Sequence, residues 1–212
     1  MLLTILTEGG YNLGFGHITR CISISHAFQL KGVEVKFLVN GDKSVDKILR
    51  GVNYKSINWI KDFEKTKSLI IDSSIILIDS ITISSDQVLK ISNLNIPVIH
   101  IDDEKQHNII NNGFILDWTV KRDYESKFTI IKHGVEYLLG SKYTPLRQDF
   151  YKEDIYILNQ NIRKIMLAFG GSDVKNITPR VLKTLVDNYP NIKKEVIIGG
   201  GFRNLTIIEE NI

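Results

Sequence analysis

Short apolar runs alternate along the chain with stretches in which apolar residues recur at helical spacing. Residues 2–7 form an apolar run that predicts a strand, and the apolar positions from Ile18 to Phe28 have the spacing of an amphipathic helix. Residues 33–39 predict a second strand. A strand, a helix and a strand in such close succession indicate a βαβ unit of a parallel sheet, whose ligands bind at the carboxyl ends of the strands.

The same alternation continues to about residue 140. Residues 75–79 are the clearest strand, because a continuous apolar run is what a sheet covered on both faces requires. The other predicted elements are a helix at 43–50, a weak strand at 52–57, a helix at 84–94, a strand at 98–103, a helix at 104–110 and a strand at 136–140. We therefore expect a Rossmann-like unit with a parallel sheet over residues 1–150.

The opening pattern appears again near the end of the sequence. Residues 151–161 are polar without a clear period, which is typical of a linker. Beyond them we predict a strand at 164–169, a helix that begins at Asn176 or Thr178 and ends at Asn188, and a strand at 195–198. This second Rossmann-like unit, residues 162–212, is incomplete and offers too little apolar surface to stand alone. It is expected to dock on the first unit, to self-associate through its open sheet edge, or to be part of a longer parent sequence.

A glycine-rich loop joins the first predicted strand to the first helix. Gly14 and Gly16 allow positive φ and close approach of a ligand, and the helix start offers free amides to an anion. No third glycine follows at the dinucleotide spacing, and the second strand ends on Asn40 rather than on an acid, so we do not expect NAD. His17 in this loop is a candidate general base, because imidazole is the side chain suited to proton transfer near neutral pH. The alternative is a surface or capping histidine.

Several acids follow predicted strands. Asp79 ends the clearest strand, at the same sheet edge as His17. A group of possible metal ligands lies nearby in the sequence, but we favour a partly buried histidine, capping acids and an exposed histidine over a metal centre; the group is His100, Asp102, Asp103 and His107. We expect no metal and no cofactor.

Composition narrows the class of protein. A net charge of +3 with no basic stripe argues against nucleic-acid binding, and Cys21, as the single cysteine, excludes an internal disulfide and is expected in the core. No segment approaches the ~20 apolar residues of a membrane span, and the start lacks a basic leader. These features predict a cytoplasmic protein.

Five motifs occur together in the order and approximate spacing found in a known family. They are Gly14-Phe15-Gly16-His17-Ile18-Thr19-Arg20, Ile78-Asp79, Ile101-Asp102-Asp103, the run from Leu138 to Arg147, and Phe169-Gly170-Gly171-Ser172-Asp173. Together they resemble PseG-type UDP-sugar hydrolases of pseudaminic acid biosynthesis. The arrangement is also similar to that of SpsG-type spore-coat polysaccharide proteins and, more distantly, of MurG-like glycosyltransferases.

The resemblance implies a GT-B architecture, with two Rossmann-like units facing across a cleft, and metal-independent hydrolysis of a UDP-linked amino sugar. It implies that His17 activates or orients the attacking water. Asp79, by its position, is expected either to orient a sugar hydroxyl or the imidazole or to have a structural role alone. The further substrate-binding residues that it implies are Gly14, Gly16, Arg20, Tyr143, Arg147, Gly170, Gly171, Ser172 and Asp173. Structural roles are the alternative for several of them: a tight turn at the glycine pair, helix capping by Ser172 and Asp173, and bracing of the connection by Tyr143 and Arg147.

Three functions follow as hypotheses. The first is hydrolysis of a UDP-linked deoxyamino sugar, of the UDP-2,4-diacetamido-2,4,6-trideoxy-sugar type, in nonulosonic acid or surface polysaccharide biosynthesis. The second is a GT-B glycosyltransferase of spore-coat or cell-surface polysaccharide synthesis, in which an acceptor hydroxyl replaces water. The third is a truncated, non-catalytic remnant that binds a nucleotide or a partner chain. The expected small-molecule partner is a UDP-sugar or a nucleotide.

Overall fold

The fold is built around one large, mostly parallel sheet. The computed structural model describes residues 1–103, 110–120, 129–152, 160–203 and 205–210. Eight strands lie in the order β3-β2-β1-β4-β5-β6-β8-β7, and all neighbouring pairs are parallel except β7 with β8. The strands are β1 (Leu2–Gly9), β2 (Glu34–Gly41), β3 (Tyr54–Ser56), β4 (Ile75–Asp79), β5 (Val98–Ile101), β6 (Gly113–Asp117), β7 (Thr129–Lys132) and β8 (Val135–Leu139).

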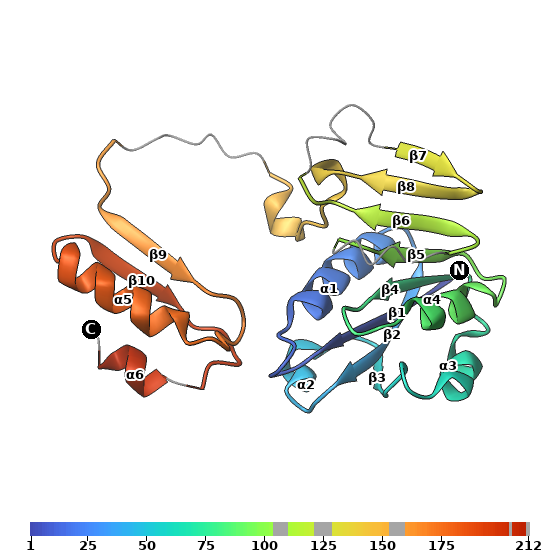
Figure 1. Cartoon of the computed structure of the whole chain (residues 1–212), viewed down its shortest axis with the longest axis horizontal. Helices are drawn as coiled ribbons and strands as arrows, with labels where there is room; N and C mark the ends of the chain where they lie inside the picture. Colours follow the sequence, from blue (N-terminus) through green and yellow to red (C-terminus); the bar gives the residue numbers. More distant parts are fainter. Residues whose placement is uncertain (104–109, 121–128, 153–159, 204, 211–212) are drawn as a thin grey trace.

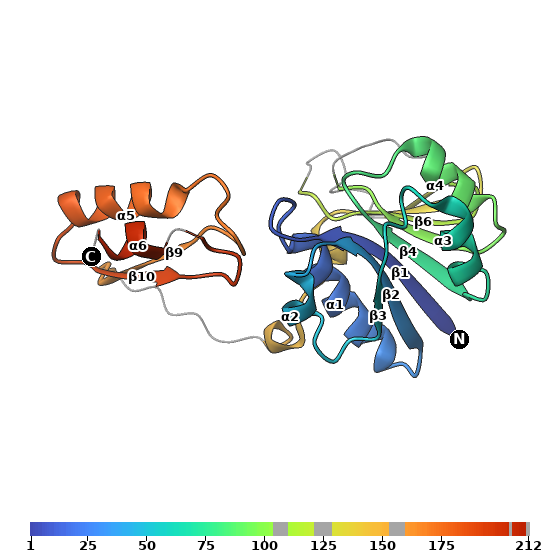
Figure 2. The ribbon, with the colours of Figure 1, turned by 90° about the horizontal axis from the view of Figure 1, so that it is seen from below.

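Helices cover both faces of this sheet. One face carries α1 (Gly16–Gln29) and the short α2 (Val45–Ile48), and the other carries α3 (Phe63–Ile70) and α4 (Ser85–Ser92) (Figure 2). Two clusters of buried residues result, one around Leu3, Ile5 and Ile18 on the α1 face and one around Leu6, Ile76 and Ile78 on the other. Both faces of the central strands are buried, which explains their continuous apolar runs.

The strand order reverses between β1 and β4. From β1 the chain moves outward through β2 and β3, and it then returns to the other side of β1 to form β4, β5 and β6 (Figure 1). Loops that leave the carboxyl ends of two such strands part in opposite directions, and the crevice between them is where open α/β sheets bind ligands. The Rossmann-like parallel sheet expected from the sequence is therefore confirmed.

A second, smaller unit follows a connection that the structure describes only in part. Two parallel strands, β9 (Lys164–Ala168) and β10 (Lys193–Ile197), pack with α5 (Ile177–Asn188) and α6 (Leu205–Glu209) (Figure 1). Its core contains the buried side chains of Leu167, Leu182 and Ile208. Boundaries at 150 and 161, and self-association through this sheet's edge, stay predictions.

Several sequence expectations need correction. The predicted helix at 43–50 is shorter in the structure, where α2 spans only Val45–Ile48. No element was expected where α3, β6 and β7 lie. Both α3 and β6 are short, with eight residues in α3 and five in β6, and they form because neighbouring strands and helices cover them. The predicted helix at 104–110 falls almost entirely outside the described residues.

Candidate active site

A histidine and an aspartate meet at the switch point between β1 and β4. Gly16 begins α1, so His17 lies in its first turn, while Asp79 is the last residue of β4. Thr7 of β1 pairs with Asp79, and alternation along β4 turns the Asp79 side chain to the α1 face. His17 Nδ1 lies 2.8 Å from Asp79 Oδ1. The sequence expectation that these two residues share one sheet edge is confirmed.

Arg20, one turn further along α1, holds the same carboxylate. Its Nε donates to Asp79 Oδ2 at 2.6 Å and its Nη2 to Oδ1 at 2.5 Å. Nη1 donates to Asp103 Oδ2 at 2.5 Å, and the guanidinium carbon lies 5.0 Å from the centre of the Trp118 ring. A bidentate guanidinium with a second carboxylate and an aromatic face is held in one orientation. Asp79 is thereby fixed from two sides.

Burial makes this ion pair consequential. The Asp79 side chain is fully buried, whereas the side chains of His17 and Arg20 keep 17% and 21% exposure. Burial alone would raise the pKa of Asp79, but the hydrogen bonds and charges of Arg20 and His17 outweigh it and hold that pKa below its ordinary value. Burial likewise opposes the charged form of Arg20, yet Asp79 and Asp103 raise its pKa. Both groups are therefore charged at neutral pH.

The network assigns the tautomer of His17. Arg20 Nη2 also lies 2.9 Å from Nδ1, but a ring nitrogen cannot donate to the carboxylate and accept from the guanidinium at once. We assign the proton to Nδ1, because an anionic acceptor stands 2.8 Å away. In the described part of the chain no hydrogen bond engages Nε2. Its lone pair is left to accept a proton, as in a carboxylate-oriented general base.

Cys21 confirms its expected place in the core. It is fully buried, and its Sγ donates to Asp79 Oδ2 at 3.3 Å. Burial and the neighbouring Asp79 raise the pKa of its thiol, which keeps it protonated and unreactive.

A groove of about 570 Å³ runs between this sheet edge and the second unit. Its lining includes Arg20, Arg147 and Phe150 from the first unit and Gly170 and Gly171 from the loop after β9. His17 is not among the lining residues, but Arg20, whose Nη2 lies 2.9 Å from His17 Nδ1, is one of them. The guanidinium carbon of Arg147 lies 5.5 Å from the Phe150 ring centre. The groove thus combines two cationic side chains with a glycine turn.

The loop after β9 packs against the glycine loop of the first unit. A Cβ placed on Gly171 would come within 2.9 Å of Phe15 Cδ2, and one on Gly201 within 3.0 Å of Phe15 Cε2. Arg203 stacks beside them, with its guanidinium carbon 4.4 Å from the Tyr11 ring centre. The two glycine-bearing loops therefore meet, with Phe15 as the side chain between them.

Other predicted site residues have structural contacts. Both carboxylate oxygens of Asp173 accept backbone N–H bonds, from Ile177 at 2.9 Å and Thr178 at 2.8 Å, so Asp173 caps α5 with its own side chain. Tyr143 Oη is 2.9 Å from Thr129 Oγ1, and its side chain lines an apolar pocket of about 590 Å³ beside α1. Gly14 has φ +77° and its carbonyl accepts from the Gly10 amide.

The predicted residues therefore fall into three places. His17, Arg20 and Asp79 interact directly, with Gly14 and Gly16 in the loop that leads to them. Arg147, Gly170 and Gly171 line the groove. Tyr143, Ser172 and Asp173 are not brought to the His17–Asp79 pair by any described contact.

Sequence reasoning missed the network behind Asp79. Glu8 is fully buried at the end of β1, and its carboxylate accepts hydrogen bonds from the loop that follows Asp79. The one available signal was an acid inside an otherwise apolar strand. Asp103, expected as a structural cap, instead pairs with Arg20.

The described residues show neither a metal-binding cluster nor a membrane-spanning helix. They contain no cluster of three or more His, Cys, Asp or Glu side chains placed to hold a metal ion, while His107 lies outside them. None of the helices within those residues has the length and apolar character needed to cross a bilayer.

Comparison with known proteins supports the architecture. No family model matches the chain. A crystal structure of MurG from Acinetobacter baumannii superimposes with a TM-score of 0.56 at 10% identity, covering 93% of this chain and 68% of that one. The chain has a GT-B-like fold.

One sequence relative is longer than this chain, and its name states no activity. The uncharacterized protein MJ1062 of Methanocaldococcus jannaschii is 27% identical over 214 residues, which cover 96% of this chain and 43% of the relative. The chain thus spans less than half of the curated relative that it matches. Neither similarity shows which reaction this GT-B-like chain catalyses.

Proposed function

We propose that the chain hydrolyses a nucleotide-activated sugar, with His17 as the general base. The observation that carries this proposal is the 2.8 Å contact between His17 Nδ1 and the buried Asp79 carboxylate, which leaves Nε2 as a proton acceptor at the switch point of a GT-B-like fold. We propose as substrate a UDP-linked deoxyamino sugar of the UDP-2,4-diacetamido-2,4,6-trideoxy type. The resemblance of the five sequence motifs to PseG-type hydrolases supports this choice.

In the proposed reaction, water attacks the anomeric carbon of the sugar. As its oxygen bonds to that carbon, a proton passes from the water to His17 Nε2, and the bond between the anomeric carbon and the diphosphate oxygen breaks. The bonding electrons leave with UDP, and the sugar is released with inverted configuration. Asp79 stabilises the imidazolium that forms, because its carboxylate faces the protonated Nδ1.

The groove supplies the charge that the leaving group needs. Arg147 is a cationic side chain in its lining, which also includes Gly170 and Gly171. A diphosphate placed there gains stabilisation as negative charge develops on it. The α5 N-terminus adds little in this proposal, since Asp173 already occupies its first amides.

Hydrolysis in H₂¹⁸O tests the proposal directly. Purified protein is incubated with UDP-2,4-diacetamido-2,4,6-trideoxy sugar without an acceptor, and the products are examined by mass spectrometry and NMR. We expect free sugar with one ¹⁸O at the anomeric position and unlabelled UDP. Label in UDP would show attack at phosphorus and would contradict the assigned step.

A glycosyltransferase is the second candidate, supported by the GT-B-like fold. An acceptor hydroxyl would then take the place of water, with the same base and the same leaving group. Turnover that requires an added sugar or lipid-linked acceptor would favour it over hydrolysis. Calorimetric binding of UDP without any turnover would favour the third hypothesis, a non-catalytic nucleotide-binding protein.

A further inference from the structure

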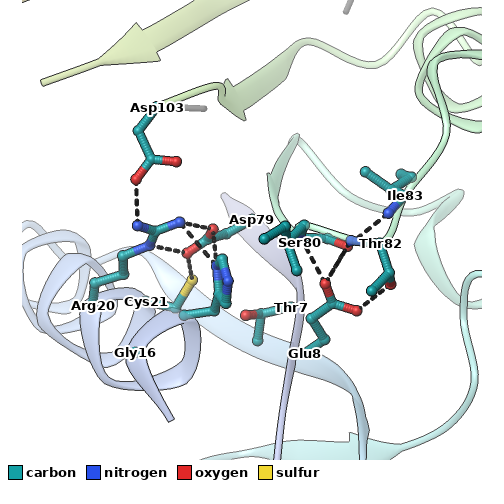
Figure 3. Close-up of polar contacts among 12 residues, drawn as sticks. Thr7, Glu8, Gly16, Arg20, Cys21, Asp79, Ser80, Thr82, Ile83 and Asp103 are labelled. Atoms are coloured by element: carbon teal, nitrogen blue, oxygen red, sulfur yellow. Dashed lines mark hydrogen bonds and ion pairs between the residues drawn. The ribbon is translucent and has the colours of Figure 1, made fainter. Parts of the chain in front are cut away.

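Glu8 forms a buried network on the opposite face of the sheet from His17. Its Oε1 accepts hydrogen bonds from Ser80 Oγ at 2.8 Å, from the Ile81 amide at 2.7 Å and from the Thr82 amide at 2.9 Å. Its Oε2 accepts from Thr82 Oγ1 at 2.5 Å. The side chain has no exposed surface. One carboxylate therefore satisfies most of the polar groups at the start of the β4–α4 loop (Figure 3).

The groups bonded to Glu8 directly follow Asp79 in the chain. Asp79 and Ser80 are consecutive, and alternation sends their side chains to opposite faces of the sheet. Asp79 is held on the α1 face by Arg20 and His17, and Ser80 is held on the other face by Glu8. The end of β4 is thus held by side chains on both faces of the sheet. On the face opposite His17, the holding residue belongs to β1, the strand that precedes the His17 loop.

Burying a carboxylate is costly, and an apolar residue would serve the core at least as well. Loop stability alone would be met by a neutral acceptor, since two backbone amides and two hydroxyls are the only groups held. What the Glu8 side chain adds to the β1–β4 pairing, which ends at Thr7 and Asp79, is a fixed path for the segment that follows Asp79.

We propose that Glu8 is a positioning residue that holds the Asp79 carboxylate where it can bond to His17. This inference rests on the proposed function for its kinetic consequence, but not for its structural one. Glu8 contacts no reacting atom. It holds residues 80–82, which directly follow Asp79, and thereby fixes the orientation of the Asp79 carboxylate. A displacement of about 1 Å in such a pair lowers rates on the order of a hundredfold.

The test compares Glu8→Ala and Glu8→Gln with a matched control. Thr66→Val removes another fully buried side-chain hydrogen bond of the same unit, from Thr66 Oγ1 to the Trp59 carbonyl at 2.9 Å, which involves neither Glu8 nor Asp79. We expect kcat to fall about a hundredfold in Glu8→Ala with KM nearly unchanged. Glu8→Gln, whose amide oxygen still accepts from the loop amides, should restore most of kcat. Thr66→Val should lose stability and keep kcat.

A second readout does not depend on turnover. The His17 Nδ1 proton gives a downfield NMR resonance when it is bonded to a carboxylate, and ¹⁵N shifts report the tautomer. Glu8→Ala should broaden or abolish this resonance, and Glu8→Gln and Thr66→Val should keep it. If Glu8→Ala does not fold, Thr82→Val, which removes only the Oε2 contact, should weaken the same resonance in a folded protein.

The outcomes separate the two proposals. A wild-type protein without hydrolase activity, but with a His17 resonance lost in Glu8→Ala, would overturn the proposed function and leave the positioning role standing. An active wild type whose Glu8→Ala variant keeps kcat and the resonance would overturn the positioning role. Equal losses in Glu8→Ala and Thr66→Val would show that Glu8 acts only through stability, and would overturn it as well.

Discussion

The two glycine-bearing loops of this protein join the strand to the helix in similar βα units, but their side chains make different contacts. In the first unit, the loop after β1 brings His17 to a buried carboxylate that belongs to another strand. In the second unit, the loop after β9 turns its acid back on its own helix, where Asp173 caps α5. His17, which follows the first loop, is therefore bonded to a residue of another strand. Asp173, in the second loop, is bonded to the helix that follows it. This difference predicts that substitutions in the first unit affect the chemical step, while those in the second affect stability and binding.

Replacement of the buried carboxylate should have the largest effect. Asp79→Asn leaves the Arg20 guanidinium without its charged partner and no longer favours the Nδ1 proton of His17. Breaking one side of a buried ion pair costs roughly 3–5 kcal/mol, and loss of the tautomer lowers kcat by a factor on the order of 10⁴. Chemical denaturation and steady-state kinetics measure the two effects. A variant with normal stability and normal kcat would show that the pair is not the reacting centre.

His17→Gln should separate chemistry from folding. Its side chain is partly exposed and at the start of a helix, so the melting temperature should change little. Removal of a general base lowers kcat by about 10²–10⁴-fold. The matched control is His26→Gln, which changes an exposed histidine of the same helix and should be silent. Unfolding of the His17 variant with full activity per folded molecule would contradict the assignment.

Arg147→Gln tests the groove without touching the His17–Asp79 pair. We expect UDP to bind about tenfold more weakly, which corresponds to about 1.4 kcal/mol, because a charge-assisted contact to phosphate is lost. Titration calorimetry with UDP and with uridine gives the measurement. The affinity for uridine should not change, and an equal loss for both ligands would place Arg147 away from the diphosphate.

Asp173→Ala should have a smaller effect, confined to the second unit. Loss of an N-terminal cap costs about 0.5–2 kcal/mol, so α5 should become less stable. Hydrogen exchange should show this loss in α5 and leave β1 and β4 protected, with kcat unchanged at saturating substrate. A fall in kcat larger than the fall in affinity would bring Asp173 into the reaction and remove the contrast between the two loops.

Acid should weaken the first unit through Asp79. Because the folded-state pKa of Asp79 is lowered, this carboxyl group contributes stability that is fully present above its unfolded value near ~3.9 and is lost as the pH falls through the folded value. The melting temperature should therefore fall steeply below about pH 4. The Asp79→Asn variant, already destabilised, should show a shallower acid dependence. Parallel curves for the two proteins would contradict this linkage.

Much of the fold and part of the site could be predicted from local patterns. The run at residues 75–79 is long, apolar and ends on an acid, and β4 has those bounds. The helix predicted at 84–94 is present as α4, and Ser84 before it forms a capping box with Gln87. His17 and Asp79 were placed at one sheet edge because the carboxyl ends of parallel strands meet there. By contrast, α3 and β6 are short segments that no prediction covered, and packing against neighbouring elements stabilises them.

The amino-acid sequence by itself determined the alternation of strands and helices, the glycine loop and the chemical groups available at the sheet edge, because period, turn chemistry and residue type are local properties. The tertiary structure alone decided that Arg20 grips Asp79 and Asp103, that Glu8 fastens the segment after Asp79, and that Phe15 lies between the two glycine loops. These contacts join residues far apart in the chain. Their distances depend on strand order and register, which no local pattern of residues encodes.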